Sequence, residues 1–144
     1  MSTDLTTPTT RDDAATVQGI YEAFGRGDVP AILDCLADDV EWERHSEDYG
    51  VPWLEPGTGK DHVAGFFGRL AANLELTRFE PQAPAVGDAL VVVPVLVEGR
   101  VLHNDRVFED LDVHVWWFDG EGRVQAFKHA VDTKKHVEAF AAGT

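Results

Sequence analysis

The sequence has a single cysteine, few basic residues and no long apolar run, and each scarcity excludes a class of protein. Cys35 alone can form neither an internal disulfide nor a metal site of several thiolates. The longest apolar run, 89–97, is about half the ~20 residues that a membrane-spanning helix needs. The 12 Lys and Arg against 26 Asp and Glu give a net charge of −14, which repels phosphate backbones and anionic lipid. We therefore expect neither nucleic acid nor a membrane surface as a partner.

The ends of the chain differ in character from its middle. Residues 1–11 are polar, rich in Thr, and lack the apolar segment of a signal peptide, so we expect a flexible N-terminal tail. Residues 12–144 are enough for one domain with a sizeable core. The composition therefore predicts a single-domain, cytoplasmic protein.

Helical spacing of apolar residues predicts three helices in the first half of the chain. The three stripes are Val17, Ile20, Tyr21 and Phe24; then Val29, Ile32, Leu33 and Leu36; then Val63, Phe66, Phe67, Leu70 and Leu74. Gly25 and Gly27 end the first helix, and Asp28 caps the second, which would contain Cys35 as a small core residue. A short closing helix over 133–142 is capped by Asp132 or Thr133.

Alternating patterns predict strands over 40–45, 76–79, 89–98, 111–118 and 124–131. Pro94 marks a sheet edge or a bulge because it cannot donate to a ladder. The turn at 120–122 closes a tight hairpin, with Gly122 suited to a positive φ. Helices followed by a run of antiparallel strands indicate an α+β fold.

Two segments are expected to reach toward a cavity. In the strand at 40–45, Trp42 and Arg44 share one face, which leaves Glu43 on the other. The loop at 46–59 is rich in Gly and Pro and long enough to act as a lid. Its large side chains, Tyr49, Trp53 and Leu54, would then cover the cavity.

The order and spacing of several motifs resemble the NTF2-like superfamily. The motifs lie at 17–24, 27–28, 36–40, 57–59, 114–116, 122–124 and 131–133, and the resemblance covers about residues 14–140. This superfamily includes ketosteroid isomerases, SnoaL-type polyketide cyclases and limonene-epoxide hydrolases, and the Gly-Thr-Gly at 57–59 fits the SnoaL-like branch. The resemblance implies a cone in which N-terminal helices pack on a curved antiparallel sheet around a pocket. It also implies a homodimer formed through the outer face of the sheet.

The resemblance does not carry the isomerase catalytic residues with it. Positions that hold a tyrosine and two aspartates in ketosteroid isomerases are Ile20, Arg44 and His114 here. Ordinary ketosteroid isomerisation is therefore not expected. The acidic group that cyclases and epoxide hydrolases carry on the last strand corresponds to His129, an imidazole that can move protons near neutral pH.

The closing hairpin predicts the polar part of the site. Asp112, His114 and Trp116 alternate onto one face of their strand, and Phe127 and His129 share a face of the next. A turn that pairs residue 118 with residue 123 would place Asp112 opposite His129, and a bulge at the turn would shift this pairing.

The candidate site therefore has polar and apolar parts. The candidate catalytic residues are His114, His129, Arg44 and Asp112. The candidate ligand-binding residues are Trp42, Trp53, Phe66, Phe67, Trp116, Phe127 and Ile20. A histidine would take a proton beside a carbonyl, Asp112 would orient it, and Arg44 would stabilise the oxyanion. The expected ligand is small and mostly apolar, and the expected reaction is that of an isomerase, cyclase or lyase.

Other interpretations stay open at this stage. The histidines could be structural and Arg44 could pair with a nearby acid, which would leave a non-catalytic ligand-binding or dimerisation domain. His103, Asp105, His114 and His129 are metal-ligand types, but no short ligand spacing supports a site, so we expect no metal and no cofactor. Trp116 and Trp117 face opposite ways, and Trp117, with Val113 and Val115, suits a dimer interface.

Overall fold

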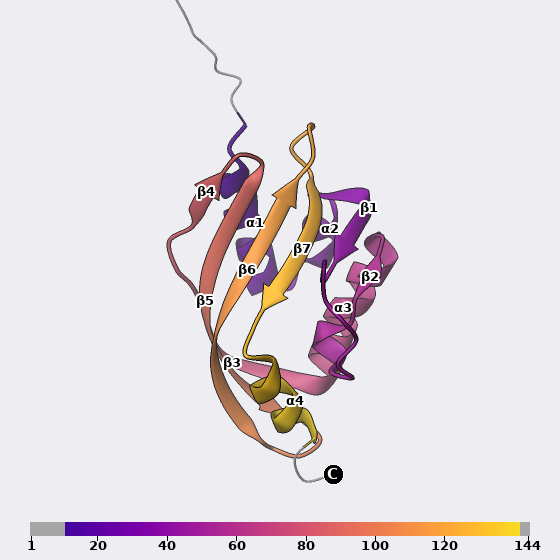
Figure 1. Ribbon diagram of the computed structural model, residues 1–144, viewed down its shortest axis with the longest axis vertical. Coiled ribbons are helices and arrows are strands. Elements are labelled where there is room, and N and C mark those ends of the chain that lie inside the picture. The colour runs from indigo at the N-terminus through magenta and orange to yellow at the C-terminus, as the bar shows by residue number, and fades with distance from the viewer. Residues whose placement is uncertain (1–10, 142–144) are drawn as a thin grey trace, which may run out of the picture.

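The computed structural model describes residues 11–141, in which helices cover a curved sheet (Figure 1). The helices are α1 (Asp13–Gly25), α2 (Val29–Leu33), α3 (Lys60–Asn73) and α4 (Thr133–Ala141), with a short 3₁₀ helix, η2 (Pro52–Leu54). The strands are β1 (Leu36–Trp42), β2 (Gly57–Thr58), β3 (Leu74–Pro81), β4 (Ala85–Gly87), β5 (Leu90–Val101), β6 (Val107–Phe118) and β7 (Val124–Ala130). The predicted α+β architecture, with helices packed on a curved sheet, is confirmed.

The sheet is mixed, whereas the sequence predicted an antiparallel one. Its strand order is β2-β1-β7-β6-β5-β3, with β4 added to β5. All pairs are antiparallel except β1 and β7, which run parallel because the chain crosses the whole sheet between them. Helices α1, α2 and α3 lie on one face of the sheet, and α4 closes one end (Figure 1).

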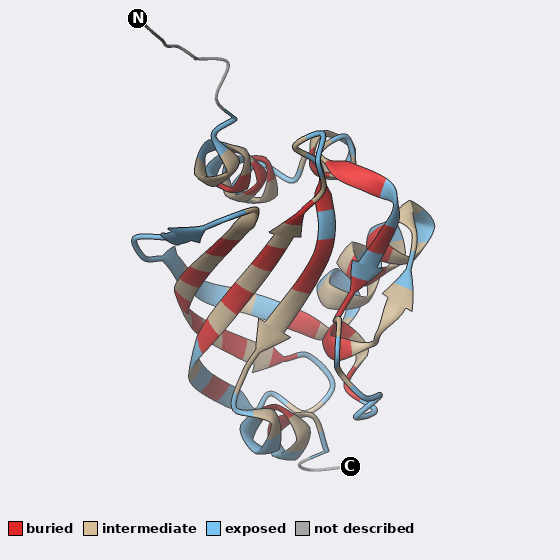
Figure 2. Ribbon diagram, turned by 45° about the horizontal axis from the view of Figure 1, so that its top comes forward, coloured by how far each residue is buried: buried red, intermediate tan, exposed pale blue. Residues whose placement is uncertain are grey.

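Strict alternation builds the core on the concave side of the long strands. Along β5 and β6, buried residues alternate with half-buried ones, as the banding in Figure 2 shows. The inward residues of β5 include Val91, Val93 and Val95, all almost fully buried. Burial of such side chains stabilises a fold by about 1.5–3 kcal/mol each. The outward face of the same strands keeps half-buried apolar residues.

The second helix begins after Asp28, as the sequence predicted, but two of the apolar stripes run past the ends of their helices. The side chains of Asp12 and Asp28 accept the N–H groups of the first turns of α1 and α2. Helix α2 ends at Leu33, so Leu36 lies in β1 and Cys35 lies in the turn between them, not in the helix. Leu74 likewise begins β3 rather than ending α3. An apolar residue that starts the next strand is buried as well as one inside the helix. Apolar spacing alone therefore cannot show where a helix ends.

The register of the β6–β7 hairpin differs from the predicted pairing. His114 lies opposite His129, and Phe118 lies opposite Val124, with an irregularity after Trp117. Gly122 has φ +82°, as expected for this turn. The turn is one residue longer than predicted, and Gln125 is an extra residue in β7 beside the step from Trp117 to Phe118. Together they move the pairing by two positions, so Asp112 does not face His129.

Pro94 lies at a gap in one side of the sheet, in keeping with its missing donor. Its carbonyl accepts the N–H of Gln82 at 2.8 Å, and the N and C=O of a strand residue face the same side. That side is where β3 has ended at Pro81 and β4 has not begun. Strand β4 itself, a short exposed segment, was not predicted.

The expected tail lies mostly outside the described residues, as does residue 142 of the predicted closing helix. Arg11 is described, and its guanidinium donates to the carbonyl of Asp119 at 2.6 Å. In the part of the chain from residue 11 to residue 141, no helix combines the length and apolar character needed to cross a membrane. The cytoplasmic location stays a prediction.

Candidate functional site

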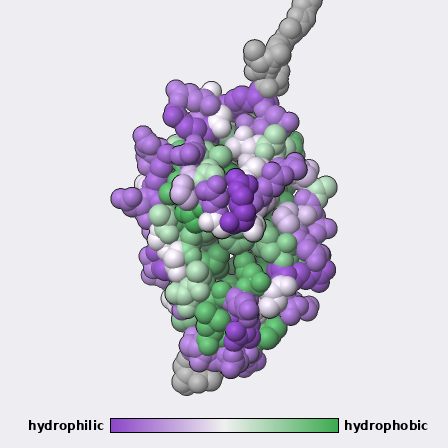
Figure 3. Space-filling model, turned by 180° about the vertical axis from the view of Figure 1, so that it is seen from behind, coloured by the Kyte–Doolittle hydropathy of each residue, from purple (hydrophilic) through white to green (hydrophobic). Residues whose placement is uncertain are grey.

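An apolar cavity lies between α1–α3 and the concave face of the sheet. The centre of a water-sized sphere can occupy about 70 Å³ of it, space for a few waters or a compact ligand. A second hollow of about 220 Å³ adjoins it and shares Phe24, Phe67 and Leu70 as wall residues. Figure 3 shows the face on which hydrophobic side chains gather around a hollow.

All the candidate ligand-binding residues lie on the cavity wall. They are Ile20, Trp42, Trp53, Phe66, Phe67, Trp116 and Phe127. Trp42 stacks on Phe127 with 4.4 Å between ring centroids, which fixes both rings. The loop before α3 contributes Trp53 and Leu54, both buried, but Tyr49 is 41% exposed and covers nothing. The predicted cover is therefore partial.

Arg44 is not in the cavity, contrary to the prediction. Strand β1 ends at Trp42, and Glu43 then takes a left-handed backbone conformation with φ +59°. This breaks the alternation, so that Glu43 turns inward and Arg44 turns outward. The Arg44 guanidinium lies over the Trp117 ring at 5.0 Å and 3.4 Å from the carboxylate of Glu41. An arginine held there cannot stabilise an oxyanion in the cavity.

Glu43 and His129 form a carboxylate–imidazole pair in which Glu43 is buried and the His129 side chain is 14% exposed. Glu43 is 2% exposed, and its Oε1 accepts the backbone N–H of His129 at 3.1 Å. Its Oε2 contacts Nδ1 of the same histidine. Burial alone would lower the pKa of His129, but the Glu43 carboxylate outweighs it and raises that pKa above the ordinary value. Because Nδ1 is committed to Glu43, Nε2 is the nitrogen available to the cavity.

His114, opposite His129, is held in the neutral state. The indole N–H of Trp116 donates to the hydroxyl oxygen of Tyr21 at 3.1 Å, and this hydroxyl lies 2.8 Å from His114 Nδ1. The buried phenol needs an acceptor for its own hydrogen, and Nδ1 provides it, which leaves the ring proton on Nε2. Burial, reinforced by the charge of His129, lowers the pKa of His114 well below its usual value. Burial also raises the pKa of Tyr21, so the phenol stays protonated.

The two imidazoles are therefore neighbours whose pKa values are shifted in opposite directions. Their ring centroids are 4.8 Å apart and their planes are nearly perpendicular. His129 favours the protonated form and His114 the neutral form, although both are histidines on adjacent strands. Groups whose environments push their pKa values apart are typical of acid–base sites.

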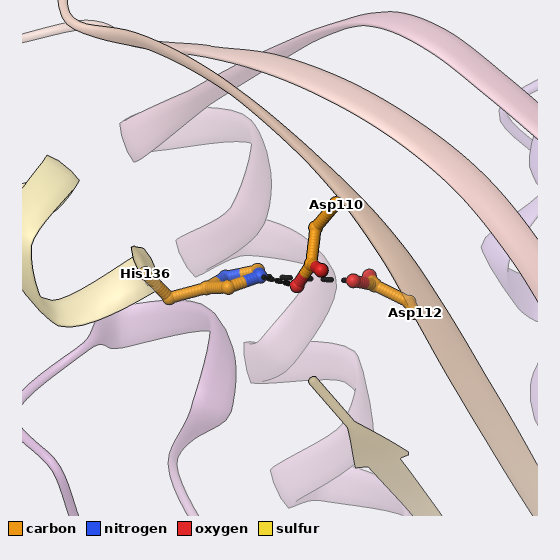
Figure 4. A group of neighbouring side chains, drawn as sticks. All are labelled: Asp110, Asp112 and His136. Atoms are coloured by element: carbon orange, nitrogen blue, oxygen red, sulfur yellow. Dashed lines mark hydrogen bonds and ion pairs between the residues drawn. The ribbon is translucent and has the colours of Figure 1, made fainter. Parts of the chain in front are cut away.

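A second polar group lies at the α4 end of the cavity. Asp112 lines the cavity as predicted, but it contacts His136 and lies beside Asp110 rather than facing His129 (Figure 4). His136 is 2% exposed, and its Nε2 lies 2.9 Å from Asp110 Oδ2. The sequence analysis missed His136 and Glu43. A usable signal existed for His136, because it lies four residues after the capping Asp132 and four before Phe140 on one helix face.

Asp110, Asp112 and His136 are the group of described residues in which ligand atoms for a metal ion come together. Their candidate atoms lie within 4.8 Å of one another. The four metal-ligand candidates that the sequence offered do not form one group. Asp105 pairs with Arg100 at 2.5 Å, and His103 packs on Phe140.

Comparisons with known proteins agree with this architecture. The family model described as SnoaL-like domain matches residues 17–127. No curated protein matches the sequence. An NTF2-like protein of unknown function from Burkholderia pseudomallei is similar at 27% identity and TM-score 0.80, covering 92% of this chain and 100% of its own.

Two further structures are similar in fold at lower identity. A proposed polyketide cyclase from Pseudomonas putida shares 20% identity with TM-score 0.69, covering 92% of this chain and 100% of its own. TerC, co-crystallised with polyporic acid, shares 20% identity with TM-score 0.72, covering 89% of this chain and 97% of its own. The family match spans most of the chain and the fold agrees with it, so this protein belongs to the SnoaL-like domain family of the NTF2-like superfamily.

Proposed function

We propose that this protein catalyses proton transfer on a small, mostly apolar carbonyl compound, as an isomerase, cyclase or lyase would. The observation that carries the proposal is the pairing of His129 with Glu43 beside the neutral His114 in an apolar cavity. A base that is oriented by a carboxylate and shielded from bulk water is what proton abstraction from carbon requires. The reaction class is thus assigned to the site, and the ligand's identity is not.

His129 is the base in this scheme. Its Nε2 takes a proton from the carbon next to the ligand's carbonyl, and the C–H electron pair forms the enolate C=C bond. The negative charge moves to the carbonyl oxygen, and Glu43 stabilises the imidazolium that results. His129 acts from its unprotonated form, in which Nδ1–H donates to Glu43 and Nε2 is free. The raised pKa makes this form a stronger base than an unperturbed imidazole, while it reduces the fraction of molecules that carry it at neutral pH.

His114 and Tyr21 take the role that the sequence analysis gave to Arg44. The Nε2–H of His114 is a neutral donor that can hydrogen-bond the enolate oxygen, and the Tyr21 hydroxyl fixes the tautomer that presents it. One preorganised donor of this kind contributes about 2.7–4 kcal/mol to lowering a barrier. In an isomerisation, the proton then returns from His129 to a different carbon of the conjugated enolate, and the carbonyl re-forms. In a ring closure, the enolate carbon attacks a second carbonyl carbon of the ligand, the C=O electron pair moves to that oxygen, and the oxygen takes the proton from His129.

Relatives support a ligand of this class. One structural neighbour carries the name of a polyketide cyclase, and TerC was crystallised with polyporic acid. These are statements about those proteins. They make an apolar, oxygen-bearing organic molecule a reasonable first choice for this cavity.

A non-catalytic binding domain is the competing function. The same apolar walls would hold a ligand without any reaction, and Arg44, which lies outside the cavity beside Glu41, cannot contribute to catalysis. The Glu43–His129 pair favours the enzyme, because a passive binding site has no need for a charged pair at its wall.

Hydrogen exchange separates the two functions. Unliganded protein would be incubated in D₂O with α-tetralone and β-tetralone, and deuterium uptake beside each carbonyl followed by NMR. We expect uptake above the buffer rate, reduced about 10²-fold or more in His129→Gln and unchanged in His45→Gln, which alters an exposed histidine outside the cavity. Uptake at the buffer rate with both ketones, or equal uptake in both variants, would contradict the proposed reaction.

We also propose that two copies associate through the outer face of the sheet. This face carries half-buried apolar side chains from β5 and β6: Val92, Leu96, Val113, Val115 and Trp117. An exposed apolar surface of this kind marks an association site. Light scattering should give twice the chain mass of 15.8 kDa for the wild type and for the α1 control Gln18→Glu, and the single mass for Val115→Glu. A wild type of single mass at high concentration would refute the dimer.

A further inference from the structure

The cluster of Asp110, Asp112 and His136 at the α4 end of the cavity plays no part in the mechanism above. Two carboxyl groups from β6 and one imidazole from α4 meet there, as Figure 4 shows. The side chains are only 8%, 7% and 3% exposed in that order. Two buried carboxylates side by side repel each other, so the cluster must contain a compensating positive charge or a proton.

The hydrogen bond from Trp53 decides the state of His136. An indole N–H can only donate, and that of Trp53 donates to His136 Nδ1 at 3.0 Å. Nδ1 must therefore be unprotonated, and the single ring proton lies on Nε2, which donates to Asp110 at 2.9 Å. His136 is thus a neutral imidazole and brings no positive charge to the two carboxyl groups.

The same argument disfavours a metal ion. A metal bound at Nε2 would displace the ring proton to Nδ1, where the Trp53 N–H already points. Two donors would then face each other inside the core. Binding a cation would require breaking a buried hydrogen bond whose indole partner is itself packed against Phe108.

Of the two carboxyl groups, Asp110 is the one that is ionised. It accepts both the His136 Nε2–H and the backbone N–H of Asp132, the latter at 3.0 Å. Burial would raise its pKa, but these two donors hold that pKa below its ordinary value. Asp112 has no comparable support: its Oδ1 is buried with no hydrogen-bond partner among residues 11–141.

The other groups near Asp112 do not change this difference between an ionised Asp110 and a protonated Asp112. Burial raises its pKa and the Asp110 charge adds to the effect, whereas His136 and the charge of His129 oppose it. The net direction is upward, which agrees with the geometry. Lys135, the nearest lysine on α4, donates to the carbonyl of Glu109 and is exposed.

We propose that one of the two carboxyl groups is protonated and that this group is Asp112, so that the α4 end of the cavity presents a neutral carboxylic acid to the ligand. This makes Asp112 a hydrogen-bond donor for an acceptor oxygen, with Asp110, His136 and Trp53 as positioning residues. The assignment of a ligand to this cavity rests on the proposed function, whereas the proton itself does not.

The proposed Asp112 carboxylic acid restricts the kinds of ligand that the cavity can bind. Asp112 and His114 are two residues apart on one strand face, so their Cα atoms lie about 7 Å apart along the cavity. A neutral compound with carbonyl or ether oxygens at two points of an apolar body could accept from both. A ligand carboxylate at the Asp112 end is disfavoured, because the charge of Asp110 lies directly behind it.

Infrared spectroscopy of the unliganded protein at neutral pH tests the proton directly. A protonated carboxyl group has a C=O stretch separate from the bands of ionised carboxylates. We expect this band in the wild type, its loss in Asp112→Asn, and its retention in Glu138→Gln, an exposed carboxylate on α4. No such band in the wild type, or its persistence in Asp112→Asn, would overturn the proposal.

Two measurements on the wild type cover the case in which Asp112→Asn does not fold. Nitrogen-15 NMR should show His136 with an unprotonated Nδ1 and a protonated Nε2, and an imidazolium signature would overturn the proposal. Excess Zn²⁺ should leave the infrared band unchanged, and its loss on saturable zinc binding would assign the cluster to a metal instead. Neither readout depends on turnover, so failure of the proposed reaction remains a separate result.

Discussion

At the scale of single residues, the three histidines of the site occupy two protonation states. His129 gains a proton from its contact with Glu43, His114 is kept neutral by burial, and His136 is kept neutral by the indole of Trp53. The residue type was readable from the sequence, but the state was not. It depends on partners from distant segments, since Glu43 lies 86 positions from His129 and Trp53 lies 83 from His136.

The neutral state of His114 predicts a loss of stability in acid. The unfolded chain takes up a proton at this histidine near pH ~6.5, whereas the folded protein does not until well below that pH. The contribution of His114 to the free energy of unfolding should therefore fall by up to about 1.4 kcal/mol per pH unit below pH ~6.5, whereas a protonated Asp112 contributes the opposite slope in the wild type and in His114 variants alike. His129 adds no slope there, because its raised pKa keeps it protonated in both states.

Urea titrations at several pH values measure this effect. His114→Gln keeps an acceptor for the Tyr21 hydroxyl but cannot be protonated, so its stability should decline less between pH ~6.5 and ~5. The exposed His45→Gln should keep the wild-type slope. Parallel curves for wild type and His114→Gln would mean that His114 is not held neutral by the fold.

At the scale of secondary-structure elements, the sequence predicts periodic burial patterns, whereas it does not show where a backbone irregularity breaks them. The stripes of α1 and α3 and the alternation of β5 and β6 follow from burial on one face, so the apolar wall residues were found. The end of β1 was missed because a single positive φ at Glu43 has no periodic signature. Because of this one backbone conformation, Glu43 turns inward in place of the expected Arg44.

Helix α4 closes the end of the cavity where Asp112 lies, and its start depends on one side chain. Asp132 Oδ1 accepts the N–H of Lys135 at 3.2 Å, which resolves the choice between Asp132 and Thr133 as the cap. Asp132→Ala should lower the free energy of unfolding by about 1 kcal/mol, because an N–H of the first turn loses its acceptor. Its backbone N–H to Asp110 is retained in this variant.

Chemical denaturation of Asp132→Ala beside Glu138→Ala checks the cap. Glu138 is exposed on the same helix, and its removal should change the stability by at most a few tenths of a kcal/mol. Equal midpoints for Asp132→Ala and wild type would show that α4 does not rely on this cap.

At the scale of the whole molecule, the cone brings together residues that no local pattern connects. The family resemblance predicted the fold and a cavity, and the acid–base chemistry depended on hairpin register and on the parallel β1–β7 pair. That parallel pair is what carries Glu43 to His129. The sequence named His129 and Asp112 as candidates, but it could not supply their partners, because pairing at long sequence separation is decided by the complete sheet.

The cavity holds two adjacent histidines whose pKa values are shifted in opposite directions, and Glu43 causes the upward shift of His129. NMR titration of the ring nitrogens measures this most directly. In the wild type, His129 should titrate above pH ~6.5 and His114 well below it. In Glu43→Gln the His129 midpoint should fall, whereas the exposed, matched variant Glu41→Gln should leave it in place. Two midpoints that coincide near ~6.5 in the wild type would contradict the account.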